Sequence, residues 1–411
     1  MIQKFISMNY SRFFHFFSLI PFLIGSSLYD SLPSSSYINV LLNNRLSIPS
    51  VIVVAVICKR LMRVILDAPV GMIVDKTIGP MASVQIGILL KILSFLMLFL
   101  EGPVAFFAYI IIDSISVVFF RGKINVLQYN VLSSIGEEES YAAFNAKYNI
   151  CLYLFTAILG FVGNFIFVRF GINGVISISL LFLIVSFALV SGASRFLKKQ
   201  SLEYVASEAL SSGSIKSYKI DWRAVLNRRY VGFILLLGVC CVAWTLNVIN
   251  QFFAVEISGE LFASKVFIYG CVAMFFGAVA SMHIKTKNVV LLSTIFCIIL
   301  LVNIALPFII PEKYVFVTMF LYFLFFNVYE NVLRCIIMKN TPEHTRCSIA
   351  SISSTLTSVI SIAVIAIFQF TKSAVGLSFS YSAVFMFCAV FAFVGFACIL
   401  SVKKPTKDGI K

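Results

Sequence analysis

The sequence predicts an all-α membrane protein with twelve transmembrane helices, arranged as two six-helix halves. Three observations support this fold class. Hydrophobic residues make up 60% of the chain and charged residues only 12%, more apolar surface than a soluble domain can bury. Apolar runs of about 20 residues recur throughout, each long enough to cross a hydrocarbon core as a helix. An internal repeat divides these runs into two sets of six.

Twelve apolar runs are expected to form the membrane spans, in chain order. The first run is longer than the apolar region of a signal peptide and lacks a clear cleavage site, so we expect it to remain as an anchor. The runs cover residues 12–30, 47–73, 83–101, 104–130, 142–168, 172–195, 229–256, 262–283, 288–310, 314–338, 347–371 and 376–401.

The basic residues predict the orientation of these spans. With the N-terminus inside, most fall on the cytoplasmic side, and few fall outside. We therefore expect a multi-pass protein of the bacterial cytoplasmic (inner) membrane with both termini in the cytoplasm. The net charge of +15 then reflects topology and anionic lipid rather than a nucleic-acid partner. The residues expected outside are Arg45, Arg169, Lys265, Lys313 and Lys372.

The internal repeat predicts the domain organisation. A single shift of 206 residues sets Glu137 on Glu343 and Gly71 on Gly277, so one register matches two separate loops. We expect an N-terminal half at 1–197, a cytoplasmic linker at 198–228 and a C-terminal half at 229–411. The linker is rich in Ser and basic residues, which is typical of a flexible connection.

The loop from Asp67 to Pro80 carries a spaced set of glycines and charges, Gly71, Asp75, Lys76 and Gly79. Glycine lets two helices approach closely, and a carboxylate here can cap a neighbouring helix or pair with a basic side chain. A polar turn with a capping Asp is the simpler interpretation. The spacing resembles the loop between helices 2 and 3 of the major facilitator superfamily, except that Pro80 and Met81 replace a basic pair. The resemblance implies a gate at this loop.

A second resemblance narrows the family. The segments Phe120–Arg121–Gly122, 132–139 and 141–145 resemble the helix 4 to helix 5 region of macrolide and enterobactin exporters. That branch implies outward movement of small molecules driven by proton entry, and a basic partner for Asp75 at Arg121. The halves would rock about a central cavity in alternating access.

Charges within the second predicted span are candidates for lining this cavity, because a charge in lipid is costly unless it faces water or a partner. Arg60, Arg63 and Asp67 form a basic face, and Arg63 and Asp67 are four residues apart. An internal salt bridge is the alternative. Lys59 points elsewhere and is interpreted as a lipid-interface or inter-helix charge.

Two carboxylates within the spans are candidates for proton coupling, Asp113 first and Glu330 second. A desolvated carboxylate binds a proton more readily, although Asp113 could instead pair with Arg60. Glu330 and Arg334 are four residues apart and flanked by Asn327 and Asn331, a set that could bind a charged substrate or hold helices together.

Aromatic side chains in two spans of the second half could line a cavity for an amphipathic compound, among them Trp244. Phe is frequent throughout the chain, so ordinary lipid-facing rings are the alternative.

The sequence thus favours a monomeric secondary transporter exporting a small amphipathic molecule with a coupling proton. Uptake of a metabolite by the same fold is one alternative, and a transport-inactive receptor or immunity protein is another. An enzyme is not expected, since no catalytic triad, metal-type cysteine spacing or phosphate loop is visible. We expect no cofactor and no metal.

Overall fold

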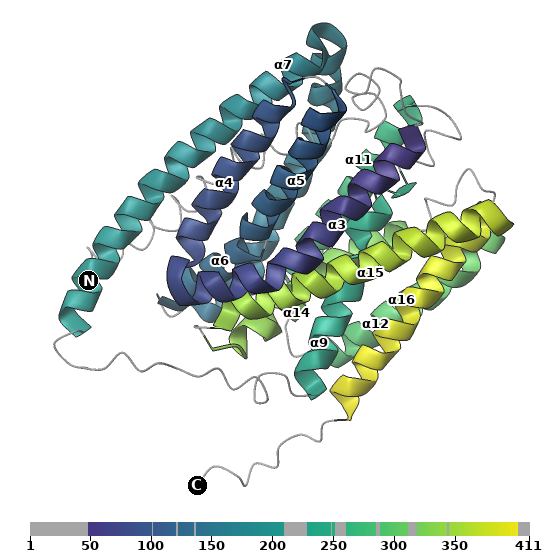
Figure 1. Ribbon diagram of the computed structural model, residues 1–411. Coiled ribbons are helices and arrows are strands. Elements are labelled where there is room, and N and C mark those ends of the chain that lie inside the picture. The colour runs from purple at the N-terminus through teal and green to yellow at the C-terminus, as the bar shows by residue number, and fades with distance from the viewer. Residues whose placement is uncertain are drawn as a thin grey trace, which may run out of the picture.

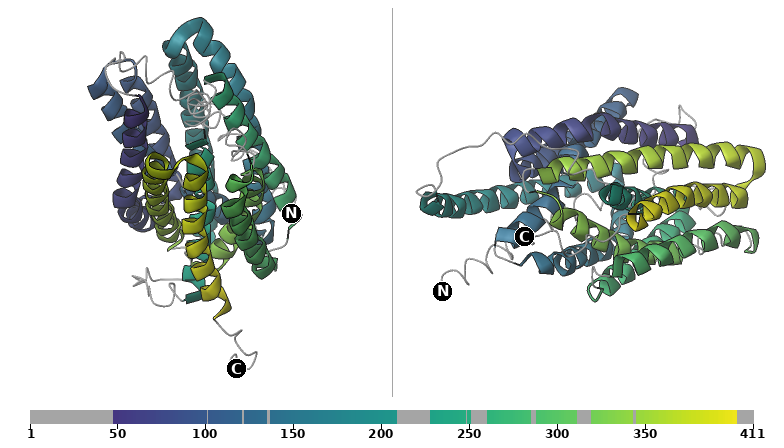
Figure 2. Two further views of the ribbon diagram at one scale, coloured as in Figure 1. Left: turned by 90° about the vertical axis from the view of Figure 1, so that its right-hand side faces the viewer. Right: turned by 90° about the horizontal axis from the view of Figure 1, so that it is seen from below.

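The computed structural model describes residues 48–100, 102–120, 122–134, 137–208, 228–247, 249–250, 260–284, 288–310, 319–342 and 345–401. Within these ranges the chain is a bundle of long helices that run roughly side by side (Figures 1 and 2). The elements are α3 (Ile48–Ile73), η1 (Val74–Ile78), α4 (Pro80–Met97), α5 (Pro103–Phe120), α6 (Lys123–Ser134), η2 (Glu138–Ser140), α7 (Tyr141–Glu208), α9 (Arg228–Cys240), α11 (Glu260–Ser281), α12 (Val289–Ala305), η4 (Leu306–Phe308), α14 (Phe320–Lys339), α15 (Arg346–Val375) and α16 (Leu377–Leu400).

Each predicted apolar run from 47 onward coincides with helix in the described residues. Two runs share α7, which bends at Gly171 with a positive φ of 67°. The run at 104–130 is interrupted at Gly122, between the end of α5 and the start of α6. The run at 12–30 lies outside the described residues, as does the linker from 209 to 227. Helix α7 continues to Glu208, into the segment predicted as linker.

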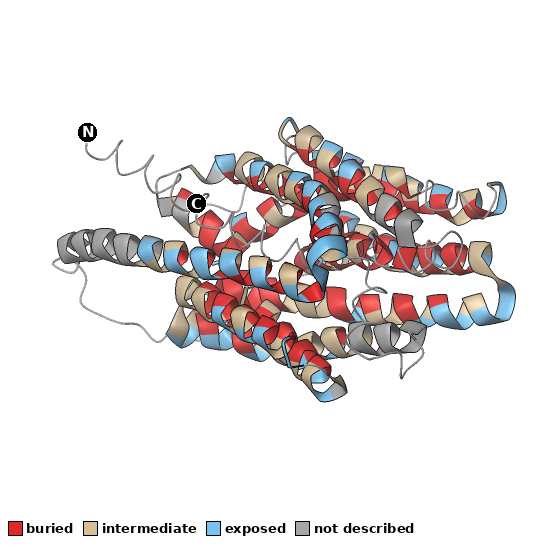
Figure 3. Cartoon of the chain, turned by 90° about the horizontal axis from the view of Figure 1, so that it is seen from above, coloured by how far each residue is buried: buried red, intermediate tan, exposed pale blue. Residues whose placement is uncertain are grey.

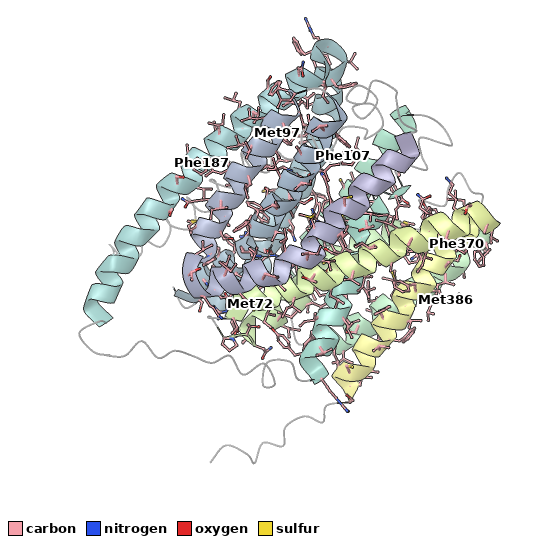
Figure 4. The ribbon with its side chains drawn as sticks, in the orientation of Figure 1. Met72, Met97, Phe107, Phe187, Phe370 and Met386 are labelled. Atoms are coloured by element: carbon pink, nitrogen blue, oxygen red, sulfur yellow. The ribbon has the colours of Figure 1, made fainter. Side chains whose placement is uncertain are left out.

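The helices carry the apolar outer surface of a membrane protein. In the described part of the chain, eight helices are long and apolar enough to span a membrane. Exposed faces alternate with buried faces along the outer helices (Figure 3). Large apolar side chains on the outside include Phe107, Phe370 and Met386, labelled in Figure 4, with exposures of 39%, 76% and 55%. Because exposed apolar area on this scale is unfavourable in water, lipid is the medium that fits it.

The helices pack in two groups. Helices α3 to α7 pack on one another around a core that includes Ile88, Tyr109 and Val175, and we call them the N-terminal group. Helices α9 to α16 pack around a second core that includes Phe296, Tyr322 and Phe385, and we call them the C-terminal group. The groups meet where α3 packs on α15 and where α7 packs on α11 and α14. We call this contact the seam.

A third apolar cluster joins the two groups at one end of the bundle, which we call the η1 end. It contains Val70 and Val74 from one group and Met338, Cys347 and Ala350 from the other. From there α3 and α15 diverge toward the opposite end (Figure 1). The structure is therefore closed at the η1 end.

Two glycines related by the predicted repeat both permit close helix approach. A Cβ at Gly71 would lie 2.7 Å from Ser351 Cβ on α15, across the seam. A Cβ at Gly277 would overlap the Leu324 carbonyl group of α14, with 2.9 Å to its carbon. Real side chains do not reach such distances, so neither position tolerates even a methyl group without movement.

We expect Gly277→Ala to lower stability by about 1–3 kcal/mol, because the methyl group meets backbone that cannot rotate away. Gly192→Ala is the matched control: nothing lies within 4 Å of a Cβ there. It should be neutral or stabilising by up to about 1 kcal/mol, since alanine favours helix more than glycine does. Thermal unfolding of the purified protein in detergent measures both. Equal effects of the two substitutions would contradict the close approach.

Candidate functional site

The predicted gate residues lie at the η1 end. Asp75 is in the short η1 turn, and its carboxylate accepts hydrogen bonds from Cys347 N at 3.1 Å and Ser348 N at 2.7 Å, and from the Ser348 hydroxyl. These groups form the first turn of α15, whose N–H groups have no partner within the helix. The carboxylate thus caps a helix of the other group, and the helix dipole favours its negative charge.

The other gate residues have different surroundings. Gly79 ends η1 with a positive φ of 78°, and its N–H bonds Val74 O at 2.8 Å, so it makes the turn into α4. Lys76 is exposed. Arg121, predicted as the partner of Asp75, lies outside the described residues.

Two further side chains connect the groups at this end, and the sequence interpretation assigned neither a role at the seam. Lys123 is fully buried and donates to Val118 O and to Ser351 Oγ, each at 2.8 Å. Arg346 donates to Asn130 Oδ1 at 2.5 Å, and its guanidinium lies 4.5 Å from the centre of the Tyr129 ring. The Lys123–Ser351 bond and both Arg346 contacts cross the seam, so the η1 end is held by charged groups as well as by the apolar cluster.

Asp113 lies inside the N-terminal group and is held by two lysines rather than by Arg60. Its Oδ1 is 2.6 Å from Lys91 Nζ, and its Oδ2 is 2.8 Å from Lys59 Nζ. Lys59 also donates to Tyr109 Oη at 3.2 Å. The alternative pairing of Asp113 with Arg60 is wrong. Of the two interpretations of Lys59, a lipid-interface charge or an inter-helix charge, the structure has the second.

Arg60 reaches across the middle of the seam. Its Nη2 donates to Thr245 Oγ1 at 2.9 Å, and Thr245 donates to Ser361 Oγ on α15 at 2.9 Å. Arg60 lies thirteen residues before the end of α3 at Ile73, about 20 Å along the helix. Asp67 is buried and lies nearer the η1 end, where its charge attracts Lys123. Arg63 is half-buried.

The polar residues of α14 form a ladder along the seam. Asn331 Oδ1 accepts from Asn145 and Asn149 of α7, at 2.5 and 3.2 Å, and its amide nitrogen donates to Ser281 of α11. One turn away, Asn327 Oδ1 accepts from Tyr153 Oη at 2.7 Å. The two asparagines therefore hold helices together, one of the two roles considered for this cluster.

Glu330 and Arg334 form an ion pair within α14. Glu330 Oε1 is 2.7 Å from Arg334 Nη2, and it also accepts from the Cys241 thiol at 3.6 Å. Trp244, three residues after Cys241, is half-buried and stacks on Tyr153, with ring centres 5.7 Å apart. Among the described residues, no group of three or more His, Cys, Asp or Glu side chains is arranged to hold a metal ion.

Comparison with solved structures identifies the fold. The human organic anion transporter TETRAN is matched with a TM-score of 0.68 over 94% of this chain and 99% of that one, at 11% identity. A bacterial homologue of the iron transporter ferroportin in an outward-facing state is matched with 0.69 over 95% and 98%, at 11% identity. The proton:xylose symporter XylE is matched with 0.65 over 94% of each chain, at 14% identity.

The chain has the fold of the major facilitator superfamily, and it spans the membrane several times. The matches cover nearly the full length of both chains, and at 11–14% identity they show the fold alone. No family model matches the chain, and no curated protein matches it. The exporter branch stays a prediction.

Proposed function

We propose that the chain is a secondary active transporter that exports a small amphipathic molecule by alternating access, coupled to proton entry. The observation that carries this proposal is the capping of α15 by Asp75, because a carboxylate of one group stabilises a helix end of the other. Such a contact costs little to break when water reaches it and forms again on closure, as a gate requires. The η1 end is the cytoplasmic end in this proposal, by the distribution of basic residues.

Two features support alternation about the seam. The polar contacts described between the groups extend from the η1 end to Arg60 in the middle, and α3 and α15 diverge beyond it (Figure 1). Such an arrangement is expected of a transporter that is closed on one side. The ferroportin homologue that it resembles was captured facing outward. Export as the direction is proposed from the resemblance of the helix 4 to helix 5 region to exporters.

We propose Glu330 ahead of Asp113 as the carboxylate that carries the proton. Asp113 neutralises two lysines, the buried Lys91 and the partly exposed Lys59, so a proton on it would leave two cations without their counter-charge. Glu330 has one basic partner, Arg334, and lies one residue from Asn331, which contacts α7 across the seam. Protonating Glu330 therefore changes one ion pair, at a place where the groups move relative to each other.

Glu330→Gln should abolish proton-dependent export. The chain is expressed in a bacterium stripped of its main pumps, and accumulation of a panel of dyes, antibiotics and labelled peptides is followed with and without a protonophore. We expect lower accumulation with the wild-type chain, lost on adding the protonophore and lost in Glu330→Gln. Glu139→Gln is the matched control, since the Glu139 side chain is 92% exposed and lies 3.7 Å from Lys339. It should export normally.

The other outcomes separate the alternatives. Raised accumulation would indicate an uptake permease of the same fold. A phenotype that persists in Glu330→Gln and with the protonophore would indicate a receptor or immunity protein that moves nothing.

A further inference from the structure

Two contacts cross the seam at the adjacent residues 244 and 245, a bond from Arg60 and a stack of two rings. Arg60, 8% exposed, donates across the seam to the Thr245 hydroxyl, which donates onward to Ser361. The next residue back, Trp244, stacks on Tyr153 of α7 with an interplanar angle of 28°. The guanidinium thus bonds residue 245, and the preceding residue in the chain, 244, carries one ring of the stack.

These contacts are of the kind that a ligand can replace. A hydroxyl is a neutral acceptor, and a carboxylate or sulfonate in its place makes charge-assisted hydrogen bonds about twice as strong. Guanidinium also matches such anions with two parallel N–H donors. The ring stack between Trp244 and Tyr153 joins the two groups, so it must separate when the groups move apart. A planar ring of a ligand, placed against Trp244 or Tyr153, would replace the stacking contact that is lost.

The charged side chains in the middle of the described spans favour an anion. Among the described residues in the middle of the spans, five cationic side chains stand against three carboxylates. These are Lys59, Arg60, Arg63, Lys91 and Arg334 against Asp67, Asp113 and Glu330. Because an excess of one sign inside a membrane is costly, a ligand of the opposite sign is stabilised there. A cationic substrate would increase the excess.

We infer that the substrate is a small aromatic anion, a carboxylate or sulfonate, bound through Arg60 in place of the Thr245 hydroxyl and with its ring against Trp244 and Tyr153. This inference rests on the proposed transport function and names its substrate class. Thr245 and Ser361 then serve as the resting partners that hold Arg60 at the seam between transport cycles.

The test is a binding measurement on the purified full-length chain. The chain has two tryptophans, Trp222 and Trp244, so Trp222→Phe leaves Trp244 as the only indole. Nitroaromatic compounds quench an indole on contact, and three that share the nitrophenyl ring carry different charges: 4-nitrobenzoate, 4-nitrobenzamide and 4-nitrobenzylammonium. We expect the benzoate to quench Trp244 at concentrations about tenfold lower than the amide, the gain typical of one hydrogen bond to a charged group. The ammonium should be the weakest.

Arg60→Gln should reduce the affinity for the benzoate to that for the amide, and Arg60→Lys should keep part of the preference. Arg169→Gln is the matched control, because Arg169 is exposed on α7 and lies over the ring of its neighbour Phe170. Size-exclusion profiles verify that each variant is folded, and Arg60→Lys keeps the test valid where Arg60→Gln fails to fold.

The inference is overturned where the benzoate shows no preference over the amide, where the ammonium binds best, or where Arg60→Gln leaves the preference intact. Failure of the proposed function is a different result. Arg60-dependent binding of the benzoate without any flux in proteoliposomes would keep the anion site and remove transport. Flux of cationic dyes only would keep transport and remove the anion site.

Discussion

Asp75→Asn should raise the equilibrium constant for opening of the η1 end about tenfold relative to the wild-type chain. The carboxylate accepts three hydrogen bonds from the first turn of α15, and asparagine keeps the shape but loses the charge. Loss of a charged cap costs about 0.5–2 kcal/mol, and about 1.4 kcal/mol corresponds to a factor of ten in the equilibrium. Because the cap joins two groups, this energy is lost from the closed state and not from the folded state as a whole.

Cys347 gives a direct measurement of this opening. It is 1% exposed and adjoins Ser348 at the capped turn, so a thiol reagent reaches it only when the seam separates. Peptide mapping after alkylation follows Cys347 among the ten cysteines of the chain. We expect its labelling rate to rise about tenfold in Asp75→Asn, the factor worked out above. Thr77→Ala is the control, since Thr77 is exposed in the same turn and its hydroxyl bonds Ile73 O at the end of α3, within the same group.

An unchanged labelling rate in Asp75→Asn would contradict the gate. A rise accompanied by an equal loss of thermal stability would show that the cap supports the fold and not the closed state. Gly71, one turn before η1, gives an independent comparison: Gly71→Ala places a methyl group against Ser351 of α15 and should raise Cys347 labelling as well.

The parts of the fold predicted from the sequence are those set by local pattern. The length and hydropathy of each run determine where a helix crosses a membrane, and each run from 47 onward coincides with helix over its described residues. The roles of the residues from Gly71 to Gly79 could likewise be predicted, because close helix approach, capping and a positive φ depend on the type of a single residue. Of the two roles considered for Asp75, capping is present in the structure.

The contacts of the site could not be predicted in the same way, because they join distant helices. Lys91 and Asp113 are 22 residues apart on α4 and α5, and no periodicity relates them. Lys59 was assigned to lipid or to another helix by its position on α3, and sequence could not decide between these. A usable signal did exist for the contacts of Asn331 with α7. Asn145 and Asn149 are four residues apart, so both lie on one face of α7 and indicate a polar partner there.

Asp113→Asn should be the most destabilising single substitution at this site. It leaves the buried ammonium group of Lys91 and the partly buried one of Lys59 without the carboxylate that separates them. Breaking a buried ion pair in this way costs about 3–5 kcal/mol, a large part of the stability of an ordinary protein. We expect a lower midpoint of thermal unfolding, which is measured by size-exclusion chromatography of heated samples in detergent.

A second substitution should recover much of this loss. Adding Lys91→Met to Asp113→Asn removes the deeper lysine, with a side chain 5% exposed, and leaves Lys59, which is 24% exposed and can extend toward the surface of the bundle. No recovery in the double variant would contradict the charge argument and point to a packing role for the Asp113 carboxyl group.

The neutral variant Lys59→Met, Lys91→Met, Asp113→Leu then separates structure from coupling at this triad. Replacing a buried ionic cluster by apolar residues of similar volume is often neutral or stabilising, so a folded protein is expected. Proton-dependent export should persist in it, because the triad supports the N-terminal group and Glu330 is the proposed proton carrier. A folded variant that exports without responding to the protonophore would contradict Glu330 as the proton carrier and indicate Asp113 instead. The two carboxylates differ in this respect because one neutralises two cations within a rigid group and the other neutralises one cation beside the seam.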